Sequence, residues 1–335
     1  MEKQTITIYD VAREAGVSMA TVSRVVNGNP NVKPSTRKKV SEVIDRLQYR
    51  PNAVARGLAS KKTTTVGVVI PSVTNLFFAS LARGIDDIAS MYRYNIILTN
   101  SDENTERKIK VFNTLLASQV DGMIIIGHNI EQRLIDEVKL TNTPVVFAGS
   151  MVEDPEVNSV NIDFEQATYE ATKSLLERDR NVALLTGPEE YSTNKVRLNG
   201  YKRAMKEFNQ VINDNWIVQY DFTEKDAERI LDELLSEGVN AAMVSQDTAA
   251  AAILNAAQER GLKVPEEFEV ISSSNSIIVD LVRPKLSSIQ SPLYDIGAVA
   301  MRLLTKIMNN EEVTERQVIL PHRIVERGST MGENQ

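Results

Sequence analysis

The sequence predicts an α/β protein in which a small helical head precedes a larger, two-lobed body with parallel sheets. Three observations lead to this prediction. Residues 1–62 carry a charge of +7, whereas the remaining residues carry −14. Apolar residues recur at helical spacing in the head, and from residue 66 short apolar runs alternate with helical patterns. A length of 335 residues fits two or three folding units of this kind.

The composition excludes several kinds of site. The chain has no cysteine, which excludes disulfides and thiolate metal sites and is typical of cytosolic proteins. Its two histidines, His128 and His322, are too few for a histidine-rich zinc site. No apolar run is long enough to span a membrane, and the N-terminus lacks the apolar core of a secretory signal. We therefore expect a cytoplasmic protein without a metal centre.

Two short helices joined by a glycine turn are predicted in the head. Apolar residues recur at helical spacing over 8–15, Gly16 ends that helix, and Ser18 can cap a second one. A third amphipathic helix follows Pro34. This arrangement is a helix-turn-helix.

The outer face of the second helix is small or hydrogen-bonding in character. Its residues are Ser18, Met19, Ala20, Thr21, Ser23 and Arg24. Short side chains allow close approach to a DNA groove, and Arg24 can bind guanine through two hydrogen bonds. The basic charge of the head then favours DNA binding over a polar face without a partner.

The stretch RPNAVARGLASKKTTT, residues 50–65, begins like a helix at Pro51 and is interrupted by Gly57. It is too short to stay helical alone in water, yet too apolar for a plain linker. We expect a conditional helix over 51–59 that forms on DNA, followed by a tether to the body.

The body repeats a strand–helix pattern twice. Its predicted strands include VGVVI, YNIILTN, DGMIIIG, PVVFAG, VALLTG, WIVQYDF, AAMVSQD and FEVISSSN. Nearly continuous apolar strands are typical of parallel sheets that are covered on both faces. Ligands of such sheets bind beyond the carboxyl ends of the strands, where Ser72, Asn75, Asp247 and Asn275 fall. The alternative interpretation is that these residues only form turns, because turn residues are often small and polar whether or not a ligand binds.

A late amphipathic segment, PLYDIGAVAMRLLTKIMNN, carries two cations four residues apart, Arg302 and Lys306. Its inward face is predicted to hold Ile296, Val299, Leu303, Leu304 and Ile307. Two cations on one helical face can hold a phosphate, although spacing alone favours a solvated face.

The segment TIYDVAREAGVSMATVSRVVNG, followed by YRPNAVARGLA, resembles the headpiece of the lactose/galactose repressor (LacI/GalR) family. The resemblance extends along nearly the whole chain and implies a periplasmic-binding-protein-like body whose chain crosses between the lobes three times. The implied divisions are a helix-turn-helix headpiece at 1–50, a hinge helix and linker at 51–62, an N-terminal lobe at 63–162 plus 292–323, and a C-terminal lobe at 163–291 plus 324–335.

The resemblance implies a set of DNA contacts. The headpiece would use Thr7, Tyr9, Ser18, Met19, Ala20, Thr21, Ser23 and Arg24, with Asn31 on the phosphate backbone. The hinge helix would lie at the minor groove with Asn52, Ala55, Arg56 and Leu58. An apolar wedge such as Leu58 unstacks a base step and bends the duplex.

Within the family, YDIGAVAMRLLTK is similar to the corepressor-docking helix of regulators of carbon catabolite repression in Gram-positive bacteria. Their partner is the phosphocarrier protein HPr, phosphorylated on a regulatory serine. By this resemblance Arg302 and Lys306 would face the phosphoserine. The other implied contacts are Tyr294, Asp295 and an exposed Met301, together with Asp87 and Tyr92 of GIDDIASMYRYN.

For the cleft, Arg197 in RLNGY matches the arginine of the family that contacts the effector. The family's aspartate in the last strand's G-F-D segment is replaced here by Ser274, which argues against tight binding of a neutral sugar. The expected cleft residues are Ser72, Asn75, Arg197, Asp247 and Asn275. We expect no cofactor beyond a weak phosphorylated-sugar modulator.

The sequence thus predicts a homodimeric, nucleoid-associated transcriptional regulator of carbon catabolite repression and activation. It would bind pseudo-palindromic operators in double-stranded DNA, with serine-phosphorylated HPr as corepressor. A sugar-inducible repressor of a single catabolic operon is the alternative. An enzyme is disfavoured, because the sequence has no phosphate-binding glycine loop, metal-ligand cluster or nucleophile elbow.

Overall fold

The computed structural model describes residues 6–50, 62–188, 191–220 and 224–332. It divides the chain into two units, Met1–Thr63 and Thr64–Gln335. The expected hinge helix, with Asn52, Ala55, Arg56 and Leu58, lies outside the described residues. Among the residues that are described, no helix is long and apolar enough to cross a membrane.

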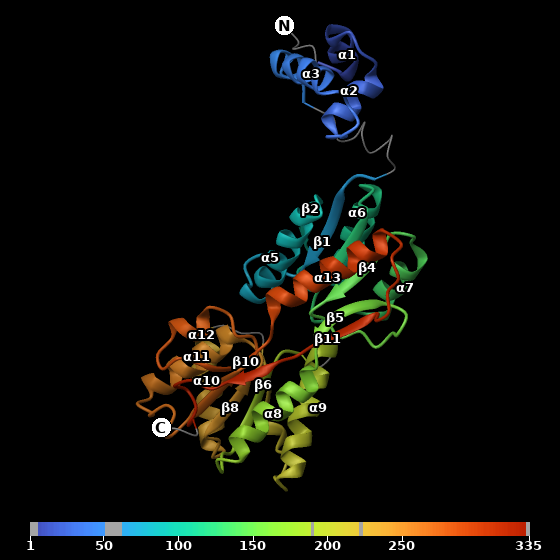
Figure 1. The fold of residues 1–335 in the computed structure, drawn as a ribbon. Helices are drawn as coiled ribbons and strands as arrows, with labels where there is room; N and C mark the ends of the chain where they lie inside the picture. Colours follow the sequence, from blue (N-terminus) through green and yellow to red (C-terminus); the bar gives the residue numbers. More distant parts are fainter. Residues whose placement is uncertain (1–5, 51–61, 189–190, 221–223, 333–335) are drawn as a thin grey trace. The chain divides into compact units, whose positions relative to one another are not determined.

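The first unit contains three helices, α1 (Ile8–Ala15), α2 (Met19–Val26) and α3 (Pro34–Leu47) (Figure 1). Helix α1 ends at Gly16, which adopts a left-handed φ of 59° at little steric cost. Helix α2 begins after Ser18, whose Oγ accepts a hydrogen bond from the Thr21 N–H at 3.2 Å. Fully buried valines, Val11, Val22 and Val40, join the three helices in one small core. The predicted helix-turn-helix is confirmed.

The second unit contains two sheets of six strands each. The first has the order β11-β5-β4-β3-β1-β2 and the second the order β12-β10-β9-β8-β6-β7. Neighbouring strands are parallel except β10 and β12. The strands are β1 (Thr65–Ile70), β2 (Asn95–Asn100), β3 (Gly122–Ile126), β4 (Val145–Ala148), β5 (Asn158–Ile162), β6 (Val182–Thr186), β7 (Ile217–Gln219), β8 (Ala241–Val244), β9 (Glu269–Ser272), β10 (Ser287–Gln290), β11 (Gln317–Leu320) and β12 (Arg323–Val325).

Helices cover these sheets, so the predicted two-lobed α/β body is confirmed. The N-terminal lobe, built on the β1 sheet, has α5 (Leu76–Met91), α6 (Thr105–Ala117), α7 (Gln132–Leu140) and α13 (Leu293–Met308). The C-terminal lobe, built on the β6 sheet, has α8 (Phe164–Leu176), α9 (Ser192–Glu207), the 3-10 turn η1 (Asp214–Trp216), α10 (Glu224–Ser236), α11 (Asp247–Glu259) and α12 (Ile278–Leu281). The chain passes between the sheets after β5, β10 and β11.

Strand β2 is not covered on both faces, contrary to the prediction for the parallel strands. It is an edge strand that pairs only with β1. Ile97 is 39% exposed and Leu98 is 44% exposed. The apolar run YNIILTN therefore leaves hydrophobic side chains on the surface of this unit.

Helices α5 and α13 lie side by side in contact at the level of their backbones (Figure 1). A Cβ atom added to Gly84 of α5 would lie 2.1 Å from the Tyr294 carbonyl oxygen of α13. A Cβ atom added to Gly297 of α13 would lie 2.1 Å from the Leu81 carbonyl oxygen of α5. Each helix thus uses a glycine to admit the backbone of the other.

Because α13 also packs against β3, β4 and β5, its buried surface is wider than one amphipathic stripe. Ile296, Leu303 and Leu304 are buried as predicted. Met301 is also fully buried in the same core, so the prediction that it is exposed was wrong. Two packing partners on different sides of the helix explain this difference.

We predict that Gly84→Ala lowers the free energy of unfolding by about 1–3 kcal/mol, because the added methyl group must push the two helices apart. Urea unfolding followed by circular dichroism measures the change. Ser90→Ala, at an exposed position of the same helix, should stay within about 0.5 kcal/mol of the parent protein. A Gly84→Ala protein as stable as its parent would contradict this account of the helix contact.

Candidate functional site

The expected DNA-reading face of the head is exposed on and around α2. The predicted contacts Thr7, Tyr9, Ser18, Met19, Ala20, Arg24 and Asn31 are exposed, whereas Thr21 and Ser23 are half-buried. Val22 and Val25 on the opposite side of α2 fill the core and so fix which face points outward. The fold therefore presents small side chains and one arginine together.

Several of these side chains also hold the helix ends. The hydroxyl and N–H of Thr7 donate to Oδ2 of Asp10 at 2.7 and 2.9 Å, and these bonds lower the pKa of Asp10. The Ser18 and Thr21 hydroxyl oxygens lie 2.9 Å apart. Arg24, by contrast, makes no ion pair with another described residue. Its guanidinium is therefore available to an external acceptor.

A second surface is formed by the α5–α13 helix pair. The Tyr294 hydroxyl donates to Oδ2 of Asp87 at 3.2 Å, and Nη2 of Arg83 lies 2.9 Å from Oδ1 of the same carboxylate. Desolvation and the Asp87 hydrogen bond raise the pKa of the Tyr294 phenol, which therefore remains a donor. The structure thus brings Asp87 and Tyr294, which are far apart in the sequence, into one polar contact.

The predicted phosphate-binding cations lie farther along α13. Arg302 and Lys306 are exposed one turn apart, and neither makes an ion pair within the described part of the chain. Asp295 and Tyr92 are exposed as well. The exposed methionine near this surface is Met91 of α5, at 71%, in place of the buried Met301. Sequence periodicity on α13 alone gave no signal for Met91.

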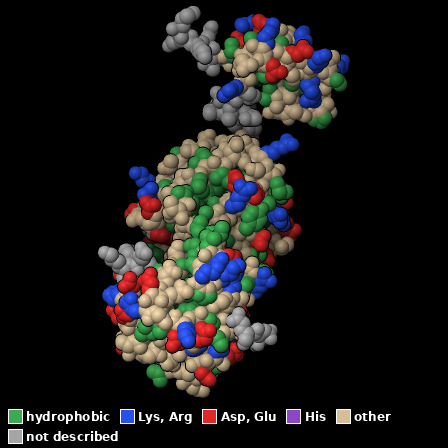
Figure 2. Space-filling view, turned by 90° about the vertical axis from the view of Figure 1, so that its left-hand side faces the viewer, with side chains coloured by type: hydrophobic (Ala, Val, Ile, Leu, Met, Phe, Trp, Pro, Cys, Tyr) green, Lys and Arg blue, Asp and Glu red, His purple; other side chains and the backbone are tan. Residues whose placement is uncertain are grey.

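A third surface is apolar. Figure 2, which faces the side of the body that holds α5 and α12, shows hydrophobic side chains gathered there. Exposed hydrophobic residues of α5, β2 and the α12 region are Leu76, Ile97, Leu98, Ile277 and Leu281. Exposed hydrophobic side chains that gather on one side of a protein are typical of an interaction site.

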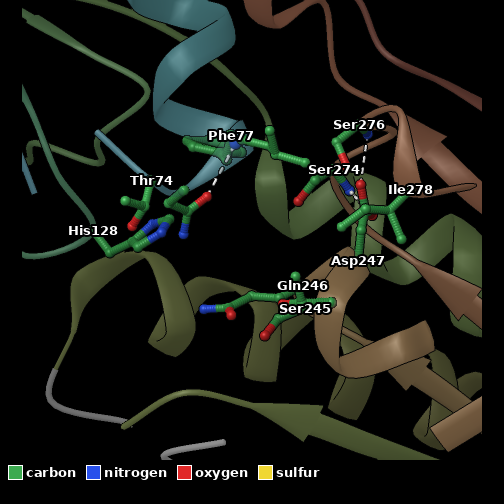
Figure 3. A pocket seen from close by; sticks show the side chains of 12 residues that line it. Thr74, Phe77, His128, Ser245, Gln246, Asp247, Ser274, Ser276 and Ile278 are labelled. Carbon is green, nitrogen blue, oxygen red and sulfur yellow. Dashed lines mark hydrogen bonds between the residues drawn. The ribbon is translucent and has the colours of Figure 1, made fainter. Parts of the chain in front are cut away.

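Two cavities with several lining residues in common lie between the lobes. The larger, about 540 Å³, is lined by Ser72, Asn75 and Arg197 among others. The smaller, about 190 Å³, is lined by residues of both lobes, including Asp247. Figure 3 shows His128 and Thr74 on one side of the smaller cavity and Asp247, Ser274 and Ser276 on the other. Both cavities share Asn75, His128, Ser245 and Gln246.

Arg197 is the cation of the larger cavity. It is only 2% exposed, and its guanidinium lies 4.7 Å from the centre of the Phe164 ring. Nη1 donates to Oδ1 of Asn194 at 3.2 Å, while Nε has no partner. Burial lowers the pKa of Arg197 to about 10, so the side chain remains charged at neutral pH. No described carboxylate pairs with it, and this uncompensated charge favours an anionic ligand.

The Asp247 carboxylate accepts hydrogen bonds from other residues of the protein. Its Oδ1 accepts from the Ser272 hydroxyl at 2.6 Å and from the Ser274 and Asn275 N–H groups at 3.3 Å. Its Oδ2 accepts from the Ser276 N–H at 2.5 Å. The carboxylate lines the cavity but holds the loop after β9, which differs from the expected role as an effector contact.

Asn275 was predicted to be a cleft residue, but the structure places it elsewhere. It lines neither cleft cavity, and faces instead a pocket of about 520 Å³ beside Tyr294 and Asp295. Its Oδ1 accepts from the Ser288 hydroxyl at 2.8 Å and from Nη2 of Arg327 at 2.7 Å. These bonds turn the amide away from the cleft.

His128 was missed by the sequence analysis as a cleft residue. It directly follows the strand-end glycine Gly127, at the carboxyl end of β3 where ligands of parallel sheets bind. Its position after a predicted strand, in a chain with only two histidines, could have identified His128 as a cleft residue from the sequence.

Two family models match the chain. Residues 7–52 match the bacterial regulatory proteins of the lacI family, and residues 63–327 match the periplasmic binding proteins and sugar binding domain of the LacI family. Catabolite control protein A of Streptococcus mutans is 51% identical over 327 residues, 97% of this chain and 98% of the relative. That of Priestia megaterium is 52% identical over 329 residues, 97% of this chain and 99% of the relative.

Solved structures show the same relationship. The transcription regulator CcpA of Lactococcus lactis aligns with a TM-score of 0.75 and 42% identity, covering 80% of this chain and 99% of that one. The lac repressor dimer bound to operator and the anti-inducer ONPF aligns with a TM-score of 0.88 and 25% identity, covering 98% and 100%.

We predict that Asp247→Ala lowers the free energy of unfolding of the C-terminal lobe by about 2–4 kcal/mol, because it leaves several buried donors without an acceptor. Fluorescence of Trp216, the single tryptophan, reports unfolding of this lobe in urea. Thr248→Ala, at the exposed neighbouring position, is the matched control and should change little. Equal stability of the two variants would contradict the role assigned to Asp247.

Proposed function

The chain belongs to the LacI family of bacterial regulatory proteins, and on that premise we propose how it acts as a transcriptional regulator of catabolite control. A dimer would bind pseudo-palindromic catabolite-responsive operators, with serine-phosphorylated HPr as the corepressor. Its place of action would be the nucleoid. The family consists of regulatory proteins, which is consistent with the absence of enzymatic motifs in the sequence.

The observation that carries the corepressor proposal is the pair of exposed cations on α13, which form no ion pair with a described residue. Arg302 and Lys306 lie one helical turn apart next to a surface that already holds Asp87 and Tyr294 in a fixed polar contact. A phosphoserine has about −2 charges and strong acceptor oxygens, which match two adjacent free cations. The neighbouring exposed Met91 offers an adaptable apolar contact to the same partner.

The apolar surface of α5, β2 and the α12 region supports a dimer. Two copies that bury this surface on each other would be related by a two-fold axis, because closed homodimers use the same patch on both subunits. Two headpieces then read two half-sites, so the symmetry of the operator mirrors that of the protein. Docking of the corepressor would favour the DNA-competent arrangement through its higher affinity for that state.

For the cleft, we propose a weak phosphorylated-sugar modulator. The charge of Arg197, which no described carboxylate compensates, supports an anionic ligand. The alternative, a repressor induced by a neutral sugar, needs a free carboxylate to accept sugar hydroxyls. Ser274 stands where the family has its aspartate, and Asp247 is already saturated with donors. These two observations disfavour the alternative.

A titration of labelled palindromic operator with and without serine-phosphorylated HPr tests the corepressor proposal. We predict tighter operator binding with the phosphoprotein, and we expect Arg302→Ala to abolish that enhancement while basal DNA binding stays unchanged. Lys110→Ala, an exposed cation on α6 of the same lobe, is the matched control and should keep the enhancement. No enhancement with the parent protein would refute the corepressor role.

Arg24→Ala tests the base-reading role of α2. We predict a loss of about 1–3 kcal/mol on the cognate site and a smaller loss on mismatched sites, as expected for one bidentate base contact. Lys38→Ala, an exposed cation on α3, should weaken all sites equally if it changes binding at all. Competition titrations at fixed salt measure both ratios, and an unchanged site preference in Arg24→Ala would refute its role.

A further inference from the structure

His128 stands out because its backbone is hydrogen-bonded on both sides, while its ring makes no hydrogen bond to a described residue. The His128 N–H donates to Oε1 of Glu103 at 3.0 Å. Its carbonyl oxygen accepts from the Thr193 hydroxyl at 3.1 Å and from the Ser192 hydroxyl at 3.4 Å. These bonds come from both lobes, so the residue is fixed at the point where the lobes meet.

The ring is also fixed by its neighbours. Its centre lies 5.4 Å from that of Phe77 and 5.1 Å from that of Phe78, with interplanar angles of 44° and 49°. Aromatic side chains at these distances pack favourably and limit rotation. The ring therefore has a defined orientation at the wall of both cavities.

Neither ring nitrogen is used inside the described part of the chain. Nδ1 is buried without a hydrogen-bond partner, and the ring makes no hydrogen bond to another described residue. Leaving a buried polar atom unpaired is costly, so native structures rarely do so without a reason. A ligand of the cleft supplies such a reason.

The ring is neutral under ordinary conditions. Burial lowers the pKa of His128 to about 4; among nearby charges, Glu103 opposes this shift, while Arg197 and Lys108 add to it. A neutral imidazole has one nitrogen that donates and one that accepts. Such a ring suits a hydroxyl group, which can do either, whereas the charged Arg197 in the same cavity suits an anion.

We propose that His128 orients the cleft ligand, a hydroxyl-bearing phosphate, by hydrogen bonding one of its hydroxyl groups while Arg197 binds the phosphate. This inference rests on the proposed phosphorylated-sugar modulator and adds the residue that distinguishes a sugar phosphate from phosphate alone. The rings of Phe77 and Phe78 set the position of the imidazole. His128 belongs to the N-terminal lobe and Arg197 to the C-terminal lobe, so the ligand would be bound from both sides.

The experiment uses the full-length protein with glucose 6-phosphate, glucose and inorganic phosphate as probes. With only two histidines in the chain, ring resonances in NMR spectra are easily assigned, and His322→Gln identifies which belongs to His128. We expect glucose 6-phosphate to shift the His128 ring nitrogens and to leave those of His322 in place. Inorganic phosphate should move them less, and glucose should not bind.

His128→Phe keeps an aromatic ring of similar size but has no ring nitrogen. We expect it to bind glucose 6-phosphate about tenfold more weakly than the parent, as for one lost hydrogen bond. Its affinity for inorganic phosphate should be unchanged, which also shows that the variant is folded and that Arg197 still binds an anion.

The outcomes separate this inference from the proposal beneath it. If the parent binds glucose 6-phosphate, but His128→Phe binds it equally well and the His128 resonances do not move, the role of His128 is refuted and the modulator stands. Equal binding and unmoved resonances are also the result expected if a bound water molecule, and not the ligand, forms the hydrogen bond with the His128 ring. If the parent binds neither phosphate probe at millimolar concentrations, the modulator and the role of His128 both fail.

Discussion

The backbone contact between α5 and α13 is the constraint on which the rest of the N-terminal lobe depends. Gly84 and Gly297 each lack the Cβ atom that would collide with a carbonyl of the other helix. At that separation the Tyr294 hydroxyl reaches Asp87, and the buried side of α13 is set by α5 and the sheet together. The side chains of Arg302 and Lys306 lie on the remaining side of α13, which faces the solvent. A wider helix spacing would change all of these positions together.

Helix α5 also connects this surface with the cleft. Its N-cap Asn75 accepts from the Phe77 N–H at 3.0 Å and lines both cavities, while Asp87 lies three turns farther along. A ligand that contacts one end of a rigid helix shifts an equilibrium at the other end only if it binds the two states with different affinity. The surface of the α5–α13 helix pair and the cleft therefore have a physical element in common, through which such a difference can act.

The sequence was most informative where local chemistry decides the structure. Gly16 and Ser18 define the turn of the head, and apolar runs define the parallel strands. It was less informative where a residue's surroundings come from several elements. Met301 has the spacing of a surface residue on an isolated helix, but it is buried because α13 has two packing partners. Asp247 follows a strand end as ligand-binding carboxylates do, yet the loop after β9 uses it.

These corrections change what the cleft can select. A cleft that binds neutral sugars offers free carboxylate and amide oxygens to many hydroxyl groups. Here Asp247 already accepts several hydrogen bonds and Asn275 is bonded elsewhere, whereas Arg197 keeps a buried charge without a counter-ion among the described residues. Burying a charge without a partner is costly, so a ligand that supplies the missing anion recovers more free energy than one that supplies only hydroxyl groups. For the proposed modulator, preference would therefore follow from which polar atoms are left unpaired among the described residues of the cleft.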